Sequence, residues 1–446
     1  MTDTNGIQKK GLGLVSLVAL AAGQVIGAGV VTLVGAAVDI TGRAVWLAYA
    51  GAVVMGFLIV LPYLVLSSMI RVKGGSYTFV ATLLGEKMGG LFGMAFTMNV
   101  FATGMIGLGF GQYFAALFPG TSVRLVAVIT ISVFFVFNLM GVNFMSKIQN
   151  ILSTTLICGL LLFVITGVGK LEPGILDISA SGYFSGGSKG FFAAIVLLVY
   201  SCYGYSFVVA YSREAKKPKR DVPLAMIITA GILLLLYSAI ALVDAGVLPL
   251  VDVAGKPLTE VARRIMPLPL YYAFVVGGPL MAIATTLNSS FTVFARPFHQ
   301  MTDDGWFPKG LARTNRFGSP YLILTIIYVI AITPIIFGFS IRMITTNTVL
   351  IGRIADVVAV CAVMTLPQKL PDAWENRYFR GMSRGLFYVL MVLSLVTMLL
   401  CIVLSFNNMA RSNVAATIVL VAVFFLYAIL RQKTGKVTMQ KSYELQ

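Results

Sequence analysis

The sequence predicts an all-α polytopic membrane protein with twelve transmembrane helices. Of its 446 residues, 58% are hydrophobic and only 11% are charged, and the mean hydropathy is +0.92. A water-soluble globule of this size cannot bury that much apolar surface. Apolar runs of about 20 residues, the length of helix that crosses a hydrocarbon core of about 30 Å, recur from Leu12 to Leu430. The two observations together exclude a water-soluble protein.

The apolar runs are separated by short polar segments, and each run is expected to form one span. The expected spans are 13–38, 44–70, 88–118, 124–142, 149–168, 190–212, 222–246, 269–298, 320–339, 341–366, 386–407 and 412–430. The polar ends of the chain are short, so a single membrane domain over residues 1–446 accounts for the whole sequence.

The distribution of basic residues predicts the orientation of the chain. The formal net charge is +17, which in a soluble protein would suggest a nucleic-acid partner. With the N-terminus placed in the cytoplasm, however, the cytoplasmic side collects 23 of the Lys and Arg residues and the opposite side only nine. This asymmetry follows the positive-inside rule. We therefore expect a multi-pass protein of a bacterial-type inner membrane, with both termini cytoplasmic, in contact with lipid and not with nucleic acid.

The four cysteines all fall within apolar runs, at spacings that indicate neither a disulfide framework nor a zinc site. They are interpreted as packing residues: Cys158, Cys202, Cys361 and Cys401. A P-loop and the HExxH and GxSxG motifs are absent, and the chain has a single histidine. We expect neither an enzyme nor a bound cofactor or metal. A channel is a further alternative, which would need a filter sequence or a ring of charges.

Glycines cluster inside the first and sixth spans, where an ordinary membrane helix would continue. The first span has Gly23, Gly27 and Gly29 within seven residues, and the sixth has Gly204 among small and hydroxyl-bearing residues. Each glycine lowers helix propensity by about 1 kcal/mol relative to alanine. Interrupted helices at corresponding positions of two halves predict a binding site near the bilayer midplane. Alternatively, these glycines only permit close helix packing.

Several motifs together resemble the amino acid–polyamine–organocation permeases over nearly all of spans 1 to 10. One is the glycine motif of the first span, from Gly23 to Val30, and another is Gly74-Gly75-Ser76-Tyr77-Thr78-Phe79 between spans 2 and 3. The third begins at Asp303-Asp304-Gly305-Trp306-Phe307-Pro308 and is similar to the loop of the arginine–agmatine antiporters. A supporting match runs from Arg213 to Pro223.

The resemblance implies a fold of two five-helix inverted repeats with discontinuous helices 1 and 6, and transport by alternating access. The first repeat would be residues 1–168, the second 190–366, and residues 386–430 would form two additional helices. An amino acid would then be the substrate, moved by a permease or an exchanger.

A broken membrane helix leaves backbone groups that an amino acid zwitterion can satisfy. The substrate carboxylate is expected at the amides of Ala28 and Gly29, where the second half of the first span begins. The resemblance implies that the ammonium faces carbonyls of Val25, Tyr200 and Tyr203. It also places Tyr200 at an aromatic gate over the substrate, although a packing role for this tyrosine is an alternative. The remaining expected site residues are Ile26, Gly27, Cys202, Gly204, Ser206, Asn99, Thr103 and Ser290.

Two departures from the family pattern leave the driving force open. Leu156 stands where several relatives have a lysine, and Ser206 stands where the arginine antiporters have a glutamate. Proton coupling, substrate exchange and a sodium site built from the Val25 carbonyl and hydroxyls of span 8 all remain alternatives. The oligomeric state is not indicated by the sequence.

The predicted pocket helices 1, 3, 6 and 8 carry no carboxylate at their middles, which favours a neutral amino acid. The exception nearby is Arg353 with Asp356 in span 10, three residues apart on one helix face. Charges inside a membrane are candidates for function. This pair would be a structural brace, a proton-linked or gating pair, or a site in which Arg353 receives an acidic substrate.

Overall fold

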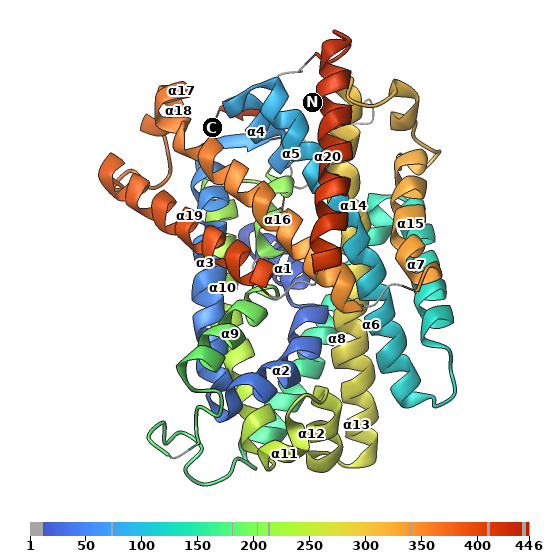
Figure 1. Cartoon of the computed structure of the whole chain (residues 1–446), viewed down its shortest axis with the longest axis vertical. Coiled ribbons are helices and arrows are strands. Elements are labelled where there is room, and N and C mark those ends of the chain that lie inside the picture. The colour runs from blue at the N-terminus through green and yellow to red at the C-terminus, as the bar shows by residue number, and fades with distance from the viewer. Residues whose placement is uncertain are drawn as a thin grey trace.

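The computed structural model describes residues 12–72, 75–180, 182–202, 204–212, 215–338, 341–407, 411–438 and 443–445, which form a bundle of helices (Figure 1). Seven helical stretches in this part of the chain are both long and apolar enough to cross a membrane. The protein is therefore an all-α membrane protein that crosses the bilayer several times, while the count of twelve crossings stays a prediction.

Helices occur at every expected span. In the first half they are α1 (Leu14–Val25), α2 (Ala28–Thr41), α3 (Val45–Ser67), α5 (Glu86–Met98), α6 (Ala102–Leu117), α7 (Val123–Leu139) and α8 (Val142–Val168). In the second half they are α9 (Gly187–Val199), α10 (Pro218–Gly246), α13 (Leu268–Val275), α14 (Met281–Asp303), α15 (Tyr321–Ile336) and α16 (Ile341–Met364). The last two are α19 (Arg384–Asn407) and α20 (Arg411–Lys433).

Shorter elements connect these helices. They are α4 (Ser76–Leu84), α11 (Leu250–Val253), α12 (Leu258–Ile265), α17 (Leu366–Lys369), α18 (Pro371–Glu375), and the 3-10 turns η1 (Gly42–Ala44) and η5 (Lys309–Ala312). Two short strands, β1 (Ile70–Val72) and β2 (Tyr443–Leu445), pair antiparallel. The ends of the bundle are named here after α4 and α12, which lie at opposite ends in Figure 1.

Both predicted breaks are present. Helix α1 ends at Val25 and α2 begins at Ala28, so Ile26 and Gly27 lie outside regular helix. In the sixth span α9 ends at Val199, and the chain resumes as the 3-10 helix η3 (Gly204–Tyr211). The backbone of both spans is thus interrupted about halfway along its length.

The structure also contains two irregularities that the sequence analysis missed. The third span is divided by a 3-10 turn, η2 (Asn99–Phe101), and the eighth by a π-helical turn, η4 (Val276–Leu280). The second has a local cause, because Pro279 cannot donate a backbone hydrogen bond. A Cβ added at Gly159 of α8 would lie 2.5 Å from the Gly278 nitrogen, so α8 and η4 pack backbone to backbone.

The helices contact one another in two groups. In one, α10 packs on α3 and α1, and α9 packs on α3 and α2. In the other, α6 packs on α7, α14 and α15. The break between α1 and α2 lies in the middle of the bundle in Figure 1. This break is therefore placed well away from both ends of the molecule.

The interpretation of the cysteines as packing residues is right for only two of them. Cys202 and Cys401 are buried, whereas Cys158 and Cys361 are exposed on the outside of the bundle. A thiol behaves as a small hydrophobic group, so an apolar run gives no sign of whether it faces protein or lipid.

The loop motif that begins at Asp303 anchors the α4 end of the bundle. The Tyr77 hydroxyl donates a hydrogen bond to Asp304 Oδ2 at 2.8 Å, and Trp306 Nε1 donates to the Tyr77 oxygen at 2.9 Å. Burial and the neighbouring Asp304 carboxylate raise the pKa of Tyr77, so its phenol stays protonated and remains a donor. The chain near the C-terminus joins this cluster, because the Thr438 amide donates to the Asp304 carbonyl at 3.0 Å.

Replacing Tyr77→Phe is expected to destabilise the protein by about 1–3 kcal/mol, because Asp304 and Trp306 each lose a buried hydrogen-bond partner. Thermal unfolding of the purified protein in detergent measures this change. Tyr272, which is 49% exposed, supplies the matched control, and Tyr272→Phe is expected to change the stability by less than about 0.5 kcal/mol. Equal unfolding temperatures for the two variants would contradict the anchoring role.

Candidate functional site

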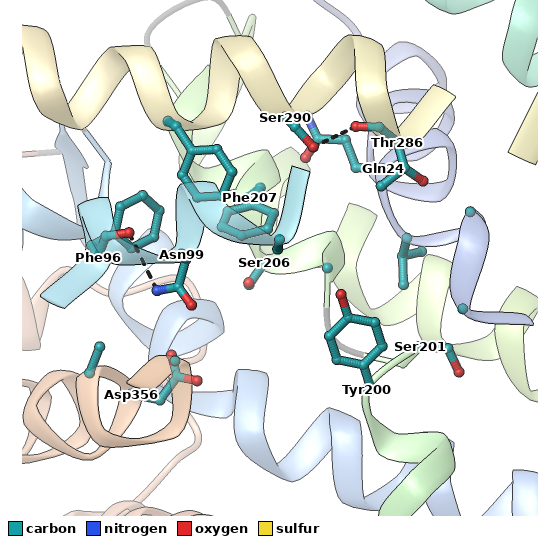
Figure 2. Close-up of a pocket in the computed structure, with 18 of the residues that line it drawn as sticks. Gln24, Phe96, Asn99, Tyr200, Ser201, Ser206, Phe207, Thr286, Ser290 and Asp356 are labelled. Atoms are coloured by element: carbon teal, nitrogen blue, oxygen red, sulfur yellow. Dashed lines mark hydrogen bonds between the residues drawn. The ribbon is translucent and has the colours of Figure 1, made fainter. Parts of the chain in front are cut away.

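A cavity of about 180 Å³ lies where the interrupted helices meet (Figure 2). Most of the predicted site residues line it. They are Val25, Gly27, Ala28, Gly29, Asn99, Tyr200, Gly204, Ser206, Ser290, Arg353 and Asp356. The volume lies below the roughly 300–1,000 Å³ of pockets that hold drug-sized ligands, so the cavity suits a small metabolite.

Four predicted site residues are not found in the lining. Ile26, Thr103 and Cys202 are each buried and point into the packed bundle. Cys202 lies against α3, because a Cβ added at Gly56 would come within 2.5 Å of the Cys202 carbonyl oxygen. The fourth residue, Tyr203, lies outside the residues that the structure describes. The structure therefore does not bring Ile26, Thr103 and Cys202 into the cavity lining, and their part in the site stays a prediction.

Glycines allow the two interrupted spans to touch through their backbones. A Cβ added at Gly29 would lie 2.5 Å from the Ser201 Cβ and 3.0 Å from its Cα. On the other half of the first span, a Cβ at Gly204 would lie 3.4 Å from the Val25 Cα. The two breaks thus lie against each other and open onto the same cavity.

The start of α2 presents a helix N-terminus to this cavity. Gly27, Ala28 and Gly29 all line it, and the Ala28 amide donates a long hydrogen bond, 3.4 Å, to Thr286 Oγ1. The first amides of a helix have no partner within the helix, and the helix dipole makes this end positive. The arrangement is suited to an anionic group such as a carboxylate.

Aromatic rings form a wall of the cavity that the sequence analysis did not identify. Phe92, Phe96, Phe207 and Phe294 line it, and the Phe96 ring lies 6.4 Å from that of Phe207 and 5.7 Å from that of Phe294, between centroids. These residues come from α5, η3 and α14. Much of any ligand in the cavity would therefore contact apolar surface.

Gln24 is another lining residue that the sequence analysis missed, and it closes one side of the cavity. Its amide Nε2 donates to the Tyr211 hydroxyl at 3.3 Å, and the Arg296 guanidinium lies 4.5 Å from the centre of the Tyr211 ring. The three residues come from α1, η3 and α14. These contacts connect both interrupted spans to α14, which belongs to the same group of helices as α6.

Arg353 and Asp356 form an ion pair at the edge of the cavity. Arg353 Nη2 lies 2.8 Å from Asp356 Oδ2, and the Tyr63 hydroxyl donates to Asp356 Oδ1 at 2.7 Å. The Arg353 side chain is 3% exposed and the Asp356 side chain 16%. Both residues line the cavity, and the side chain of Asp356 is the more exposed of the two.

A model of the family described as "Amino acid permease" matches residues 12–430, nearly the whole chain. The chain belongs to this family. The permease is 26% identical over 375 residues to the inner membrane transport protein YbaT of Escherichia coli, a match that covers 80% of this chain and 85% of that protein.

Two relatives from Bacillus subtilis carry different substrate names. The permease is 24% identical to the methylthioribose transporter over 378 residues, which cover 80% of this chain and 81% of that protein. It is also 24% identical to the branched-chain amino acid permease BcaP over 260 residues, which cover 54% of this chain and 55% of that protein. The family is one of transporters and not of enzymes. These relatives are not arginine–agmatine antiporters, so the finer resemblance has no support from them.

The two positions at which some relatives are expected to have a coupling residue lie in different environments in the permease. Leu156 is fully buried in α8, and Ser206 lines the cavity. The Val25 carbonyl, a predicted ligand for ammonium or sodium, accepts a hydrogen bond from the Tyr237 hydroxyl at 3.0 Å. A carbonyl has two lone pairs, so this bond leaves it able to accept a second one.

Proposed function

We propose that this permease is a secondary-active transporter of neutral amino acids that works by alternating access. The observation that carries the proposal is that both interrupted spans meet at a single small cavity, with the start of α2 among its lining. Backbone groups are released inside the membrane only where they line such a cavity or are buried in protein.

The amide groups at Ala28 and Gly29 would hold the substrate carboxylate at the positive end of α2. The ammonium would face the carbonyl of Val25 and, across the cavity, the end of α9 at Tyr200. Tyr203 belongs to this proposal on the family resemblance alone. Figure 2 shows the Tyr200 ring directed into the space between the helices, where it would cover a bound substrate.

Alternating access would move the group that contains α1, α3, α9 and α10 relative to the group that contains α6, α7, α14 and α15. We propose that residues 1–168 and 190–366 form the two inverted repeats, with residues 386–430 added to them. The orientation with both termini in the cytoplasm of a bacterial-type cell belongs to the same proposal.

A second candidate function, antiport of an acidic amino acid or an amine, is favoured by the Arg353–Asp356 pair in the cavity lining. The geometry is less suited to the acidic substrate, since the nearly buried Arg353 side chain is already paired with the more exposed carboxylate of Asp356. The relatives' names do not decide between these candidates, because they include a sugar derivative, branched-chain amino acids and cationic amino acids.

The test of the proposed function is counterflow in proteoliposomes. Purified permease is reconstituted into vesicles loaded with one unlabelled amino acid, and uptake of the same labelled compound is followed for neutral, acidic and cationic compounds in turn. Saturable uptake stimulated by internal neutral amino acid is expected. Uptake that is linear in concentration and indifferent to the internal solute would indicate a channel instead.

Tyr200→Ala is expected to weaken binding of the transported amino acid about tenfold, because the ring that excludes water from the site is lost. Isothermal titration of the purified variant measures the Kd. Tyr272→Ala, which removes an exposed ring, is the control and should bind like the wild type. An unchanged Kd for Tyr200→Ala would assign this tyrosine to packing.

A further inference from the structure

Polar side chains lie at the end of the cavity opposite Tyr200. Figure 2 shows Asn99 and Asp356 together on one side, with Tyr200 and Ser201 on the other. A Cβ added at Gly352 would lie 3.3 Å from Asn99 Oδ1, so this glycine allows α16 to approach the η2 turn closely. The cavity therefore has a backbone end for the main-chain groups of an amino acid and a second polar end within the same small volume.

The carboxylate of Asp356 keeps hydrogen-bonding capacity that faces the cavity. Tyr63 donates to Oδ1 and Arg353 donates to Oδ2. A carboxylate offers about four acceptor positions, so these two bonds use about half of them. Because the Asp356 side chain is 16% exposed while that of Arg353 is 3% exposed, a ligand meets an acceptor here.

The charge balance at this end decides which donors fit. Arg353 already neutralises Asp356. A cationic substrate side chain would therefore add a second positive charge at a place that has no further negative charge to balance it. An acidic side chain would meet the carboxylate first and be repelled by it. A neutral hydroxyl or amide can donate to Asp356 without adding charge, and the Phe92 and Phe96 rings line the rest of the space.

We propose that Asp356 recognises the substrate side chain by accepting a hydrogen bond from it, and that this permease selects neutral amino acids whose side chain carries a hydroxyl or amide donor. This inference rests on the proposed function, since it assumes that the main-chain groups bind at the two breaks. It distinguishes the permease from the relative named for branched-chain amino acids. A site that contains a buried acceptor discriminates strongly against a ligand without the matching donor, because the acceptor is then left unsatisfied.

The test uses pairs of amino acids that have similar shape but differ in the donor. Binding and counterflow are measured with the wild-type permease for threonine against valine, and for asparagine against leucine. The donor-bearing member of each pair is expected to bind at least about tenfold more tightly. The same measurements on Arg353→Met/Asp356→Leu, which removes the acceptor and its counter-ion together, are expected to bring both ratios to about one.

Some outcomes would overturn only the inference about Asp356, and another would overturn the proposed function as well. A wild-type permease that transports valine and leucine as well as threonine and asparagine overturns the inference and leaves the proposed function standing. Preference for lysine or glutamate overturns the inference, as does a double variant that keeps the wild-type ratios. If no amino acid of any class shows counterflow, the proposed function fails as well. The comparison of the paired amino acids with the wild-type permease tests the inference even if the double variant does not fold.

Discussion

A Gly29→Val variant is expected to lose transport completely and to be less stable than the wild type. The added Cβ would lie 2.5 Å from the Ser201 Cβ and 3.0 Å from its Cα, and a backbone atom cannot move aside as the tip of a side chain can. Overpacking of this kind costs about 1–3 kcal/mol. It would also push α2 away from the end of α9 and displace the amides that are proposed to hold the substrate carboxylate.

Counterflow and thermal unfolding, measured on the same preparation, test both parts of this expectation. The matched control is Gly231→Ala, since Gly231 is exposed on α10 and an added Cβ would meet nothing within 4 Å. Alanine within a helix is favoured over glycine by about 0.5–1 kcal/mol, so the control should be at least as stable as the wild type and fully active. Transport by Gly29→Val at the wild-type rate would show that the contact between the two spans is not needed.

Replacing Arg353→Met alone is expected to destabilise the permease by about 3–5 kcal/mol, because it leaves the Asp356 carboxylate without its counter-ion in a largely buried place. Replacing both residues, as Arg353→Met/Asp356→Leu, should recover most of this loss, since no unpaired charge remains. Thermal unfolding and the monodisperse fraction after size-exclusion chromatography measure the difference. Arg264→Met, which changes an exposed arginine of α12, is the control and should stay within about 0.5 kcal/mol of the wild type.

The result also separates the interpretations of this pair that the sequence left open. If Asp356 recognises the substrate side chain, the double variant is expected to be stable and to transport without side-chain selectivity. A stable double variant with unchanged selectivity would leave the pair as a structural brace. If the single Arg353→Met variant were as stable as the wild type, the guanidinium would not be needed to neutralise Asp356.

Local chemistry explains why much of the fold could be predicted. Hydrophobic length alone locates the spans, and helices occur at all of them. The interruption at Gly27 follows from a local cluster of glycines, and the end of α9 lies shortly before Gly204, which stands among small and hydroxyl-bearing residues. The η4 turn had a comparable signal in Gly277, Gly278 and Pro279, which the analysis of the sequence did not use.

The direction of each side chain could not be predicted in the same way. Thr103 and Asn99 lie one turn apart in the third span, yet Asn99 lines the cavity and Thr103 does not. In the sixth span Ser206 lines it, whereas Cys202 packs against α3. A helix that is apolar all round carries no periodic polar stripe to mark its inner face. The polarity of single residues was therefore a poor guide to the pocket.

The sequence by itself determined that this chain resides in a membrane, where its helices run and where two of them break, because these properties depend on short stretches of neighbouring residues. Only the tertiary structure decided that both breaks open onto one cavity, that phenylalanines from three elements form a wall of it, and that Asp356 is more exposed than its partner Arg353. Those features depend on contacts such as that of Tyr63 with Asp356, which are 293 positions apart in the chain. The pattern of residues along one helix contains no information about which distant helix will face it.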